Sequence, residues 1–269
     1  MTTDTASTDI LLTSRENGIT TLTLNRPAQR NSLSEAMMAD LHAALNEEAD
    51  RAESRVIVLA GEGPGFCAGH DLKELTAHRN DGDRGRDYFA KIMAQCSALM
   101  QAIVTCPKPV IARVHGIATA AGCQLVASCD LAIASETARF ATPGVNIGLF
   151  CSTPMVALSR NLGRKQAMEM LLTGDMISAQ QARDWGLINR VVPDEELDEA
   201  VVQLAAQIAS KSSHTLAIGK KAFYEQAQMP LGSAYDYASE VMVRNMLAHD
   251  AEEGINAFLE KRDPTWEDR

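Results

Sequence analysis

Two short segments, Phe66-Cys67-Ala68-Gly69-His70-Asp71-Leu72 and Ala120-Ala121-Gly122-Cys123-Gln124-Leu125, carry most of the information on the architecture and chemistry of this chain. Each has small residues at its centre, and small residues let a backbone N–H approach another group closely. The pair predicts two sources of backbone donors for one substrate carbonyl oxygen. The alternative is that these Ala and Gly residues only allow tight turns and close helix packing.

Short apolar segments recur on both sides of these stretches and predict strands. Several of them end at or near glycine, as in Ala60-Gly61 and His115-Gly116, which lets the backbone turn sharply after the strand. The expected strands cover residues 19–24, 56–60, 110–114, 131–134 and 187–192.

Helical patterns separate these strands. Ser32 stands three residues before Glu35, which is the spacing of a capping box, and apolar residues follow at helical intervals through Leu45. A second helical pattern runs from Ile92 to Ile103 and stops before Pro107. Strands that alternate with helices predict an α/β fold with largely parallel pairing.

The strand signal disappears at about Asp194, and the rest of the pattern is helical. We therefore expect residues 1–193 to form the α/β core and residues 194–269 to form a C-terminal helical region. The late helices have apolar faces that one chain does not fully cover, which predicts a role in assembly.

The composition argues against several classes of partner. The chain has 269 residues, 46% of them hydrophobic, and a formal net charge of −10. That charge argues against nucleic acid, which needs clustered Lys and Arg, so a polyanionic ligand must meet local cations. No run approaches the roughly 20 apolar residues of a membrane span. Residues 1–10 contain two Asp and no Lys or Arg, which is unlike a targeting peptide.

The cysteines and the absent motifs narrow the chemistry further. Since no Cys-x-x-Cys pair occurs, we expect reduced, buried thiols, no metal site and a cytoplasmic location. The glycines of Gly61-Glu62-Gly63-Pro64-Gly65 lack the spacing of a dinucleotide fingerprint, and no Gly-x-Ser-x-Gly or His-Glu-x-x-His motif is present. The six cysteines are Cys67, Cys96, Cys106, Cys123, Cys129 and Cys151.

Six motifs taken in order resemble the enoyl-CoA hydratase/isomerase (crotonase) superfamily across nearly the whole chain. Segments 120–130 and 142–154 are most similar to its enoyl-CoA hydratase domain-containing protein 3 subgroup. The resemblance implies a crotonase-like spiral of ββα units, followed by helices that build homotrimers, usually paired into hexamers. The motifs are Asn25-Arg26-Pro27 and residues 66–72, 120–130, 140–148, 172–174 and 258–262.

The resemblance also implies an acyl-CoA thioester as the ligand, in fatty-acid metabolism and with no separate cofactor, because CoA is part of the substrate. It assigns the two backbone donors of the oxyanion hole to Ala68 and Ala121. Ala28 stands where the family often has a lysine. For the CoA end it implies contacts with Arg30, Ala68, Gly69, His70 and Asp71, and with Phe258 and Lys261 of a neighbouring subunit.

The acid and base of a hydratase are missing from this chain. Hydratases of this family use two Glu, and the matching positions hold Gln124 and Gly144. An amide cannot accept a proton from water at neutral pH, and glycine offers no side chain. We therefore expect hydration to be weak, altered or lost, and isomerisation to be weakened.

Three functions remain open at this stage. The first is an acyl-CoA-handling enzyme of the hydratase/isomerase type, the second is a non-catalytic acyl-CoA-binding oligomer, and the third is another reaction of the superfamily, such as decarboxylation. His70 has a suitable ordinary pKa for proton transfer, but a loop histidine beside Asp71 is more typical of a surface hydrogen-bonding residue. Asp71 is a candidate N-cap for the helix that follows.

Overall fold

The computed structural model describes residues 9–269, so the expectation for residues 1–10 falls largely on residues outside the described part. The strands are β1 (Leu11–Glu16), β2 (Ile19–Leu24), β3 (Val56–Gly61), β4 (Val110–Val114), β5 (Ile117–Thr119), β6 (Leu131–Ser135), β7 (Arg139–Ala141), β8 (Ile177–Ser178) and β9 (Arg190–Val192). The helices are α1 (Glu35–Asp50), α2 (Leu72–Ala77), α3 (Arg86–Thr105), α4 (Ala121–Ser128), α5 (Pro154–Asn161), α6 (Arg164–Thr173), α7 (Ala179–Trp185), α8 (Leu197–Ala209), α9 (Ser213–Gln226), α10 (Leu231–Met246) and α11 (His249–Glu260). Four short 3-10 turns are η1 (Pro27–Gln29), η2 (His78–Asn80), η3 (Pro143–Ile147) and η4 (Asp194–Glu196).

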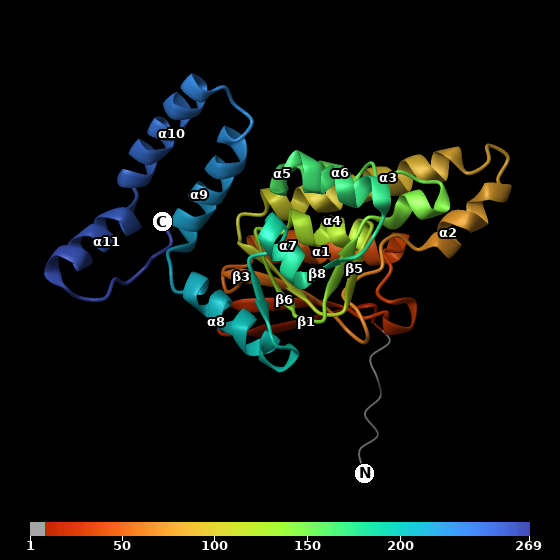
Figure 1. Ribbon diagram of the computed structural model, residues 1–269. Helices are drawn as coiled ribbons and strands as arrows, with labels where there is room; N and C mark the ends of the chain where they lie inside the picture. Colours follow the sequence, from red (N-terminus) through yellow and green to blue (C-terminus); the bar gives the residue numbers. More distant parts are fainter. Residues whose placement is uncertain (1–8) are drawn as a thin grey trace, which may run out of the picture.

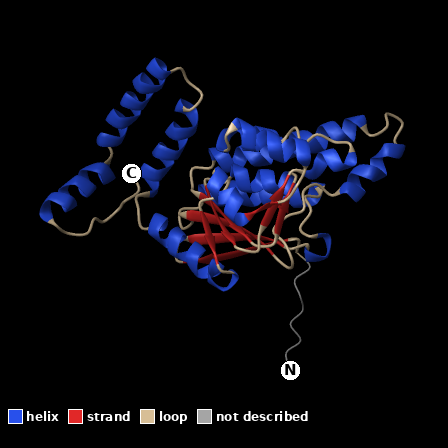
Figure 2. Ribbon diagram, in the orientation of Figure 1, coloured by secondary structure: helices blue, strands red, loops and turns tan. Residues whose placement is uncertain are grey.

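The main sheet has six strands in the order β1-β2-β3-β4-β6-β9. Only the β1–β2 pair is antiparallel, and the other four pairs are parallel. A second sheet of three short strands, in the order β5-β7-β8, stands beside it. The expected α/β fold is confirmed, and Figure 2 shows the strands covered by helices.

The two faces of the main sheet bury different side chains because consecutive residues of a strand point to opposite faces. On one face, Leu22, Leu59 and Val114 join a large apolar cluster with α1, α3 and α4. On the other face, Val58 and Ile111 pack against α8. Helix α8 is therefore part of the packed core, although it follows the last strand in sequence.

The start of α1 corrects one sequence-based expectation. The N-cap is Ser34, whose side chain accepts a hydrogen bond from the Met37 N–H, and the helix begins at Glu35. Ser32, the expected cap, instead donates from its hydroxyl to Asp71 at 3.2 Å. The capping-box pattern located the helix but chose the wrong serine, because Ser32 serves a contact with a distant segment.

Helices α9, α10 and α11 form an arm that extends from the core (Figure 1). The core here means β1–β9 with α1–α8. A partly buried ion pair fixes the base of the arm, since Lys220 Nζ of α9 lies 2.7 Å from Asp130 Oδ2 and also donates to two carbonyls of the core. The Tyr224 hydroxyl donates to the other oxygen of Asp130 at 2.9 Å.

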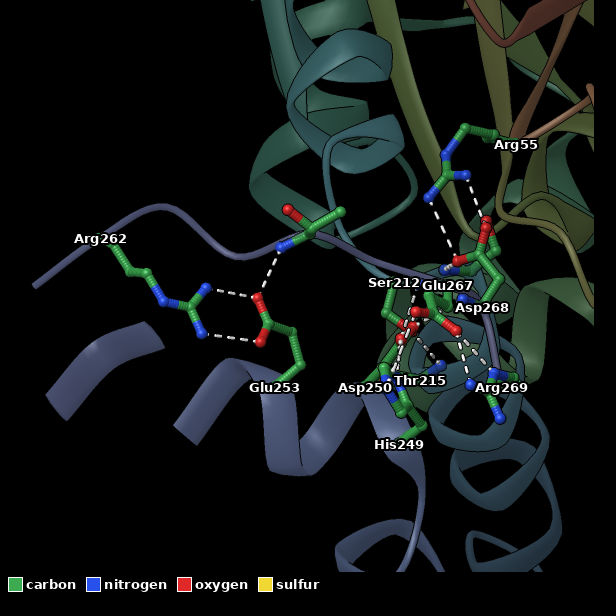
Figure 3. A network of polar contacts seen from close by, with 12 residues as sticks. Arg55, Ser212, Thr215, His249, Asp250, Glu253, Arg262, Glu267, Asp268 and Arg269 are labelled. Atoms are coloured by element: carbon green, nitrogen blue, oxygen red, sulfur yellow. Dashed lines mark hydrogen bonds and ion pairs between the residues drawn. The ribbon is translucent and has the colours of Figure 1, made fainter. Parts of the chain in front are cut away.

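A second polar network (Figure 3) joins the arm to the core near the start of α9, where the tail, residues 263–269, runs back from α11. Asp250 at the start of α11 accepts the N–H groups of Glu267 at 2.8 Å and Asp268 at 3.0 Å. The Asp268 carboxylate in turn pairs with Arg55 of the core at 2.7 Å. The tail therefore joins α11 to the core.

The cysteine prediction is confirmed, because all six thiols are free and buried. Burial raises the pKa of the Cys67 and Cys123 thiols to about 12. Among residues 9–269, every helix is too short or too polar to cross a bilayer.

Candidate functional site

The two small-residue segments lie directly against each other. The Cys67 N–H donates to the Ile117 carbonyl at 3.1 Å, and the Thr119 N–H donates to the Cys67 carbonyl at 2.9 Å. A Cβ atom added to Gly122 would lie 2.1 Å from the Cys67 carbonyl oxygen. The glycine in α4 is therefore required for this close approach.

The structure corrects the expected role of Ala68. Its N–H donates to the carbonyl of Arg30 at 3.0 Å, so this amide already has an acceptor. The Ala68 carbonyl accepts the hydroxyl of Thr119 at 3.1 Å. Ala68 therefore joins the first segment to Arg30 and to Thr119. An unpaired backbone N–H of this segment must belong to a residue after Ala68.

Among the described residues, the backbone N–H of His70 remains without a backbone acceptor when Gly69 and Asp71 pair with Leu33. The Leu33 N–H donates to the Gly69 carbonyl at 2.8 Å, and the Asp71 N–H donates to the Leu33 carbonyl at 3.1 Å. In a trans peptide the C=O and N–H point in opposite directions, so the His70 N–H points away from Leu33. Within residues 9–269 no backbone acceptor receives it.

The second amide belongs to Ala121, the first residue of α4. The first N–H groups of a helix have no partner inside the helix and carry its positive dipole end. A Cβ atom added to Gly69, which has φ +93°, would lie 3.3 Å from the Ala121 nitrogen. The two segments therefore place Gly69, the residue before His70, beside the Ala121 nitrogen.

Ala120 holds a strained conformation next to this amide. Its φ of 51° and ψ of −118° are sterically unfavourable for a residue with a Cβ. The Ala120 N–H donates to the Ala141 carbonyl at 2.9 Å, which helps to hold the residue in place. Such strain is often found where backbone groups must be aimed at a ligand.

The His70 side chain differs from the surface residue expected from sequence. Both ring nitrogens are buried, and neither forms a hydrogen bond of good geometry with a described residue. Burial lowers the pKa of the imidazole below its ordinary value of 6.5, although a weaker contact with the Leu33 backbone acts in the opposite direction. The ring is therefore neutral at pH 7 and presents one donor and one acceptor.

Asp71 has the expected structural role. Its side chain accepts the N–H groups of Lys73 at 3.2 Å and Glu74 at 3.5 Å, which confirms it as the N-cap of α2. Its other oxygen pairs with Arg26 at 3.1 Å. Although burial alone would raise the pKa of this carboxyl, the hydrogen bond from Arg26 and the capping amides lower it. Asp71 is therefore an ionised structural residue.

Gln124 lies on the same side of α4 as Ala121, since residues three apart share a helix face. The side chain is buried, with 4% of its surface exposed. Its Oε1 atom has no partner among the described residues. The side-chain oxygen of Gln124 is thus a buried acceptor without a partner in the described part of the chain, on a residue three positions after Ala121 in α4.

Gly144 lies in η3 and leaves no room for a side chain. A Cβ atom there would lie 2.5 Å from the Leu149 carbonyl oxygen and 2.9 Å from Cys151 Sγ. Burial raises the pKa of the Cys151 thiol, so this neighbour is not a ready base. Position 144 is closed by the backbone of the loop that follows it.

The residues expected at the CoA end fall into two groups. Arg30 lies beside the first segment, because its carbonyl accepts the Ala68 N–H. Phe258 and Lys261 lie at the end of α11 in the arm. Figure 1 shows α11 and α2 at opposite ends of the molecule, so a single chain does not bring these groups together.

Sequence reasoning missed Asn31, which organises the site. Asn31 has no exposed surface, and its side-chain amide donates to the carbonyls of Glu62 at 2.8 Å and Gly65 at 2.9 Å. Its Oδ1 accepts the Arg26 N–H at 2.8 Å. The residue type was the one signal available in the sequence, because Asn tolerates the left-handed backbone that it adopts here, with φ 53°.

No metal site accompanies these groups in the described part of the chain, where no cluster of three or more His, Cys, Asp or Glu side chains could hold an ion. The candidate groups are the backbone amides of His70 and Ala121, the buried His70 ring and the Gln124 side-chain oxygen. Such a set can bind a polarised carbonyl group and hydrogen-bond a neutral neighbour.

Comparisons with protein families, with relatives of known name and with solved structures all indicate the same family. The family model described as enoyl-CoA hydratase/isomerase matches residues 14–269. A rat protein named enoyl-CoA hydratase domain-containing protein 3, mitochondrial, is 50% identical over 254 residues, which cover 94% of this chain and 83% of the relative.

Two crystal structures agree with the fold. That of an enoyl-CoA hydratase from Mycobacterium smegmatis has a TM-score of 0.91 and 51% identity, covering 96% of this chain and 99% of the other. That of human enoyl Coenzyme A hydratase domain-containing protein 3 has a TM-score of 0.92 and 49% identity, covering 96% and 100%.

The expected cytoplasmic location is wrong on this comparison. The rat, mouse, human and Xenopus laevis relatives, at 48–51% identity, all carry the word mitochondrial in their names. The prediction rested on the composition of residues 1–10 and on reduced cysteines, and neither feature distinguishes one reducing compartment from another.

Proposed function

The chain belongs to the enoyl-CoA hydratase/isomerase family, and on that premise we propose that it is an acyl-CoA-handling enzyme of fatty-acid metabolism. We propose that the thioester carbonyl oxygen lies between the backbone N–H groups of His70 and Ala121. Members of the family act on acyl-CoA thioesters. The observations that support the proposal are that neither amide has a backbone acceptor among the described residues and that Gly69, which precedes His70, lies beside the Ala121 nitrogen.

Such a pair of amides stabilises the enolate that forms when a thioester gains or loses a proton at carbon 2. Removal of one donor from an oxyanion hole typically costs about 2.7–4 kcal/mol of transition-state stabilisation. Because the two donors are backbone groups held by buried segments, they need no rearrangement as negative charge develops on the oxygen.

We propose that hydration itself is slow. Gln124 cannot serve as a base, and the backbone around Gly144 leaves no room for a carboxylate. A positioned acid or base contributes roughly 10²–10⁴-fold to a rate, so the absence of both removes most of the hydratase activity. Turnover of crotonyl-CoA comparable with that of an ordinary hydratase would contradict this part of the proposal.

The amide pair has its own test, which does not depend on turnover. The carbonyl band of bound butyryl-CoA labelled with carbon-13 is expected at lower wavenumber than in water, in an isotope-edited infrared spectrum. Gly69→Ala fills the space beside the Ala121 nitrogen and is expected to abolish the shift. Gly148→Ala is the matched control, because Gly148 also has a positive φ, of 77°, but no heavy atom lies within 4 Å of the added Cβ.

Decarboxylation is the second candidate, and the closure of position 144 favours it. Loss of CO₂ from a malonyl-type thioester places the electron pair on carbon 2 and forms the enolate without a base. An oxyanion hole beside a site without carboxylates suits that reaction. Release of CO₂ from malonyl-CoA or methylmalonyl-CoA, measured with purified protein, would support it, and failure with both would remove it.

We further propose a homotrimer or a hexamer of paired trimers, in which Phe258 and Lys261 reach the CoA of a neighbouring subunit near its Arg30 and residues 68–71. Large apolar side chains on the arm support this assembly, including Phe258, which is 82% exposed. Sedimentation equilibrium is expected to give a mass of three or six chains. A monomer at micromolar concentration would contradict the proposal.

A further inference from the structure

Thr119 joins the two segments of the candidate site through both its backbone and its side chain. Its N–H donates to the Cys67 carbonyl at 2.9 Å, and its hydroxyl donates to the Ala68 carbonyl at 3.1 Å. The residue is 6% exposed. Within residues 9–269, no other group donates a hydrogen bond to the Ala68 carbonyl. The backbone pairing of the two segments ends at Thr119, and the hydroxyl extends it by one carbonyl.

The hydroxyl bond lies equally close in sequence to both proposed donors of the oxyanion hole. Thr119 is two residues before Ala121, and Ala68 is two residues before His70. Gly69 packs against the second segment at the same place. A Cβ atom added to it would lie 3.0 Å from the Thr119 carbonyl oxygen and 3.3 Å from the Ala121 nitrogen. The hydroxyl therefore holds the peptide before Gly69 against the residues that lead to the second amide.

Gly69 depends on such contacts to keep its conformation. Its φ is +93°, and glycine is the residue with the least restricted backbone dihedrals. The peptide after Gly69, which carries the His70 N–H, is held by the Leu33 N–H at 2.8 Å. The peptide before Gly69 is held by the Thr119 hydroxyl. Because both flanking peptides are held, the position of the His70 N–H relative to the second segment is set.

We propose that Thr119 is a positioning residue for the oxyanion hole, and that its hydroxyl sets the separation of the His70 and Ala121 amides. This inference rests on the proposed function, because it takes these two amides as the donors to the thioester oxygen. A threonine hydroxyl has one proton to donate, and the Ala68 carbonyl accepts it. Thr119 therefore acts on the ligand through the backbone of the first segment.

The test compares a CoA thioester with a thioether in which a CH₂ group replaces the carbonyl. Calorimetric titration of the full-length protein with butyryl-CoA and with S-butyl-CoA is expected to give an affinity ratio of about tenfold in favour of the ester, because only the ester accepts hydrogen bonds from the two amides. Thr119→Val keeps the shape of the side chain without the hydroxyl, and is expected to lower the ratio to about threefold or less, through weaker binding of the ester. A general loss of folded protein affects both ligands equally and leaves the ratio unchanged.

Two further variants of Thr119 separate the hydroxyl from the rest of the side chain. Thr119→Ser retains a hydroxyl and is expected to keep the ratio at about tenfold. Thr119→Ala removes the hydroxyl without a change in branching at the valine level of bulk, and is expected to give the low ratio of Thr119→Val. The test therefore does not depend on the folding of one variant.

Thr142 provides the matched control. It has no exposed surface, and its hydroxyl donates to the Met170 carbonyl at 2.9 Å. Thr142→Val thus removes a hydroxyl from a buried bond to a backbone carbonyl that does not join the two segments. It is expected to leave the affinity ratio at the wild-type value.

The outcomes distinguish this inference from the proposed function. A ratio that stays at the wild-type value in Thr119→Val and Thr119→Ala, or that falls equally in Thr119→Ser or in Thr142→Val, would overturn the positioning role and leave thioester binding by the amide pair intact. Equal affinities of the wild-type protein for the ester and the thioether would overturn the proposed amide pair, and this inference with it.

Discussion

In the core, large apolar side chains are buried on both faces of the main sheet, whereas in the arm α9 and α10 bury no residue and α11 buries only Asp250 and Ala257. The arm is joined to the core largely by charged groups, through Lys220 of α9 and through the tail, which pairs with Arg55 near the start of α9. The two regions therefore depend on different forces. The exposed large apolar side chains of the arm are Phe223, Leu231, Tyr235, Met242, Val243, Met246, Leu247, Ile255, Phe258 and Leu259.

The largest contrast is expected between two phenylalanines. Phe140 has no exposed surface and Phe258 is 82% exposed. Phe140→Ala is expected to lower the free energy of unfolding by roughly 3–5 kcal/mol, because it leaves a cavity in the core. Phe258→Ala is expected to change it by less than about 0.5 kcal/mol in dilute protein. Urea denaturation measures both values, and equal losses at every protein concentration would remove the distinction between the two regions.

Two neighbouring lysines test the base of the arm. Lys220→Met leaves the partly buried Asp130 carboxylate without its cation and is expected to destabilise the protein by roughly 1–3 kcal/mol. Lys221→Met is the control, because Lys221 is 74% exposed and lies 3.9 Å from Glu225, and a change below about 0.5 kcal/mol is expected. Hydrogen exchange is expected to show faster exchange of α9 amides in Lys220→Met. Unchanged α9 exchange would mean that another contact holds the arm.

Two helical glycines sharpen the comparison of core and arm, because replacement by alanine is expected to destabilise the protein at one and stabilise it at the other. Gly122→Ala in α4 places a Cβ 2.1 Å from the Cys67 carbonyl, and such overpacking typically costs about 1–3 kcal/mol. Gly219→Ala in α9 meets no atom within 4 Å and is expected to stabilise the helix by about 0.5–1 kcal/mol. Thermal unfolding measures both shifts. Destabilisation by Gly219→Ala would reveal a partner packed on that face of α9.

Acid is expected to affect the core and the arm in different pH ranges. Its effect on the free energy of unfolding is expected to be smaller than the effects of the substitutions above. The pKa of His70 is lowered by burial, so below about pH 6.5 the unfolded chain binds a proton that the folded chain does not. The free energy of unfolding therefore falls as the pH decreases from 6.5 toward the lowered value. His70→Gln is expected to flatten this slope, measured by denaturation between pH 7.5 and 5. A slope equal to that of the wild-type protein would contradict the assignment.

In the arm, the group expected to respond to acid is the carboxyl group of Asp250. Burial alone would raise the pKa of this carboxyl, but hydrogen bonds from Ser212 and from the N–H groups of Glu267 and Asp268 lower it. Its contribution is therefore present above the ordinary Asp value and is lost only as the pH falls below about 3.8. Hydrogen exchange of α11 is expected to remain slow over the pH range in which His70 weakens the core.

Regular, buried elements were predictable from the sequence. The strands β2 and β4 have the expected bounds, and α3 ends before Pro107 as its pattern indicates. The crotonase-like fold is confirmed by the crystal structures of relatives. Strand β1 was missed because its burial falls toward its charged end, where Ser14, Arg15 and Glu16 are exposed, and β5, β7 and β8 are too short for a periodic signal.

The candidate site was predictable only in part. The sequence indicated which two segments meet, because small residues mark a close approach of backbones. It did not indicate which amide of the first segment is free, since that depends on the pairing of Ala68 with Arg30 and of Gly69 and Asp71 with Leu33. These partners lie more than 30 residues away along the chain, and no local pattern encodes the direction in which a peptide group points.

The closed surroundings of Gly144 have a consequence for the history of the protein. A side chain at this position would overlap the Leu149 carbonyl, which is backbone and cannot be trimmed by a substitution at residue 149. An ancestor or descendant with a carboxylate here therefore needs a different path for residues 149–151. Replacement of Gly144 therefore depends on residues 149–151, whose backbone must move before a larger residue fits at position 144.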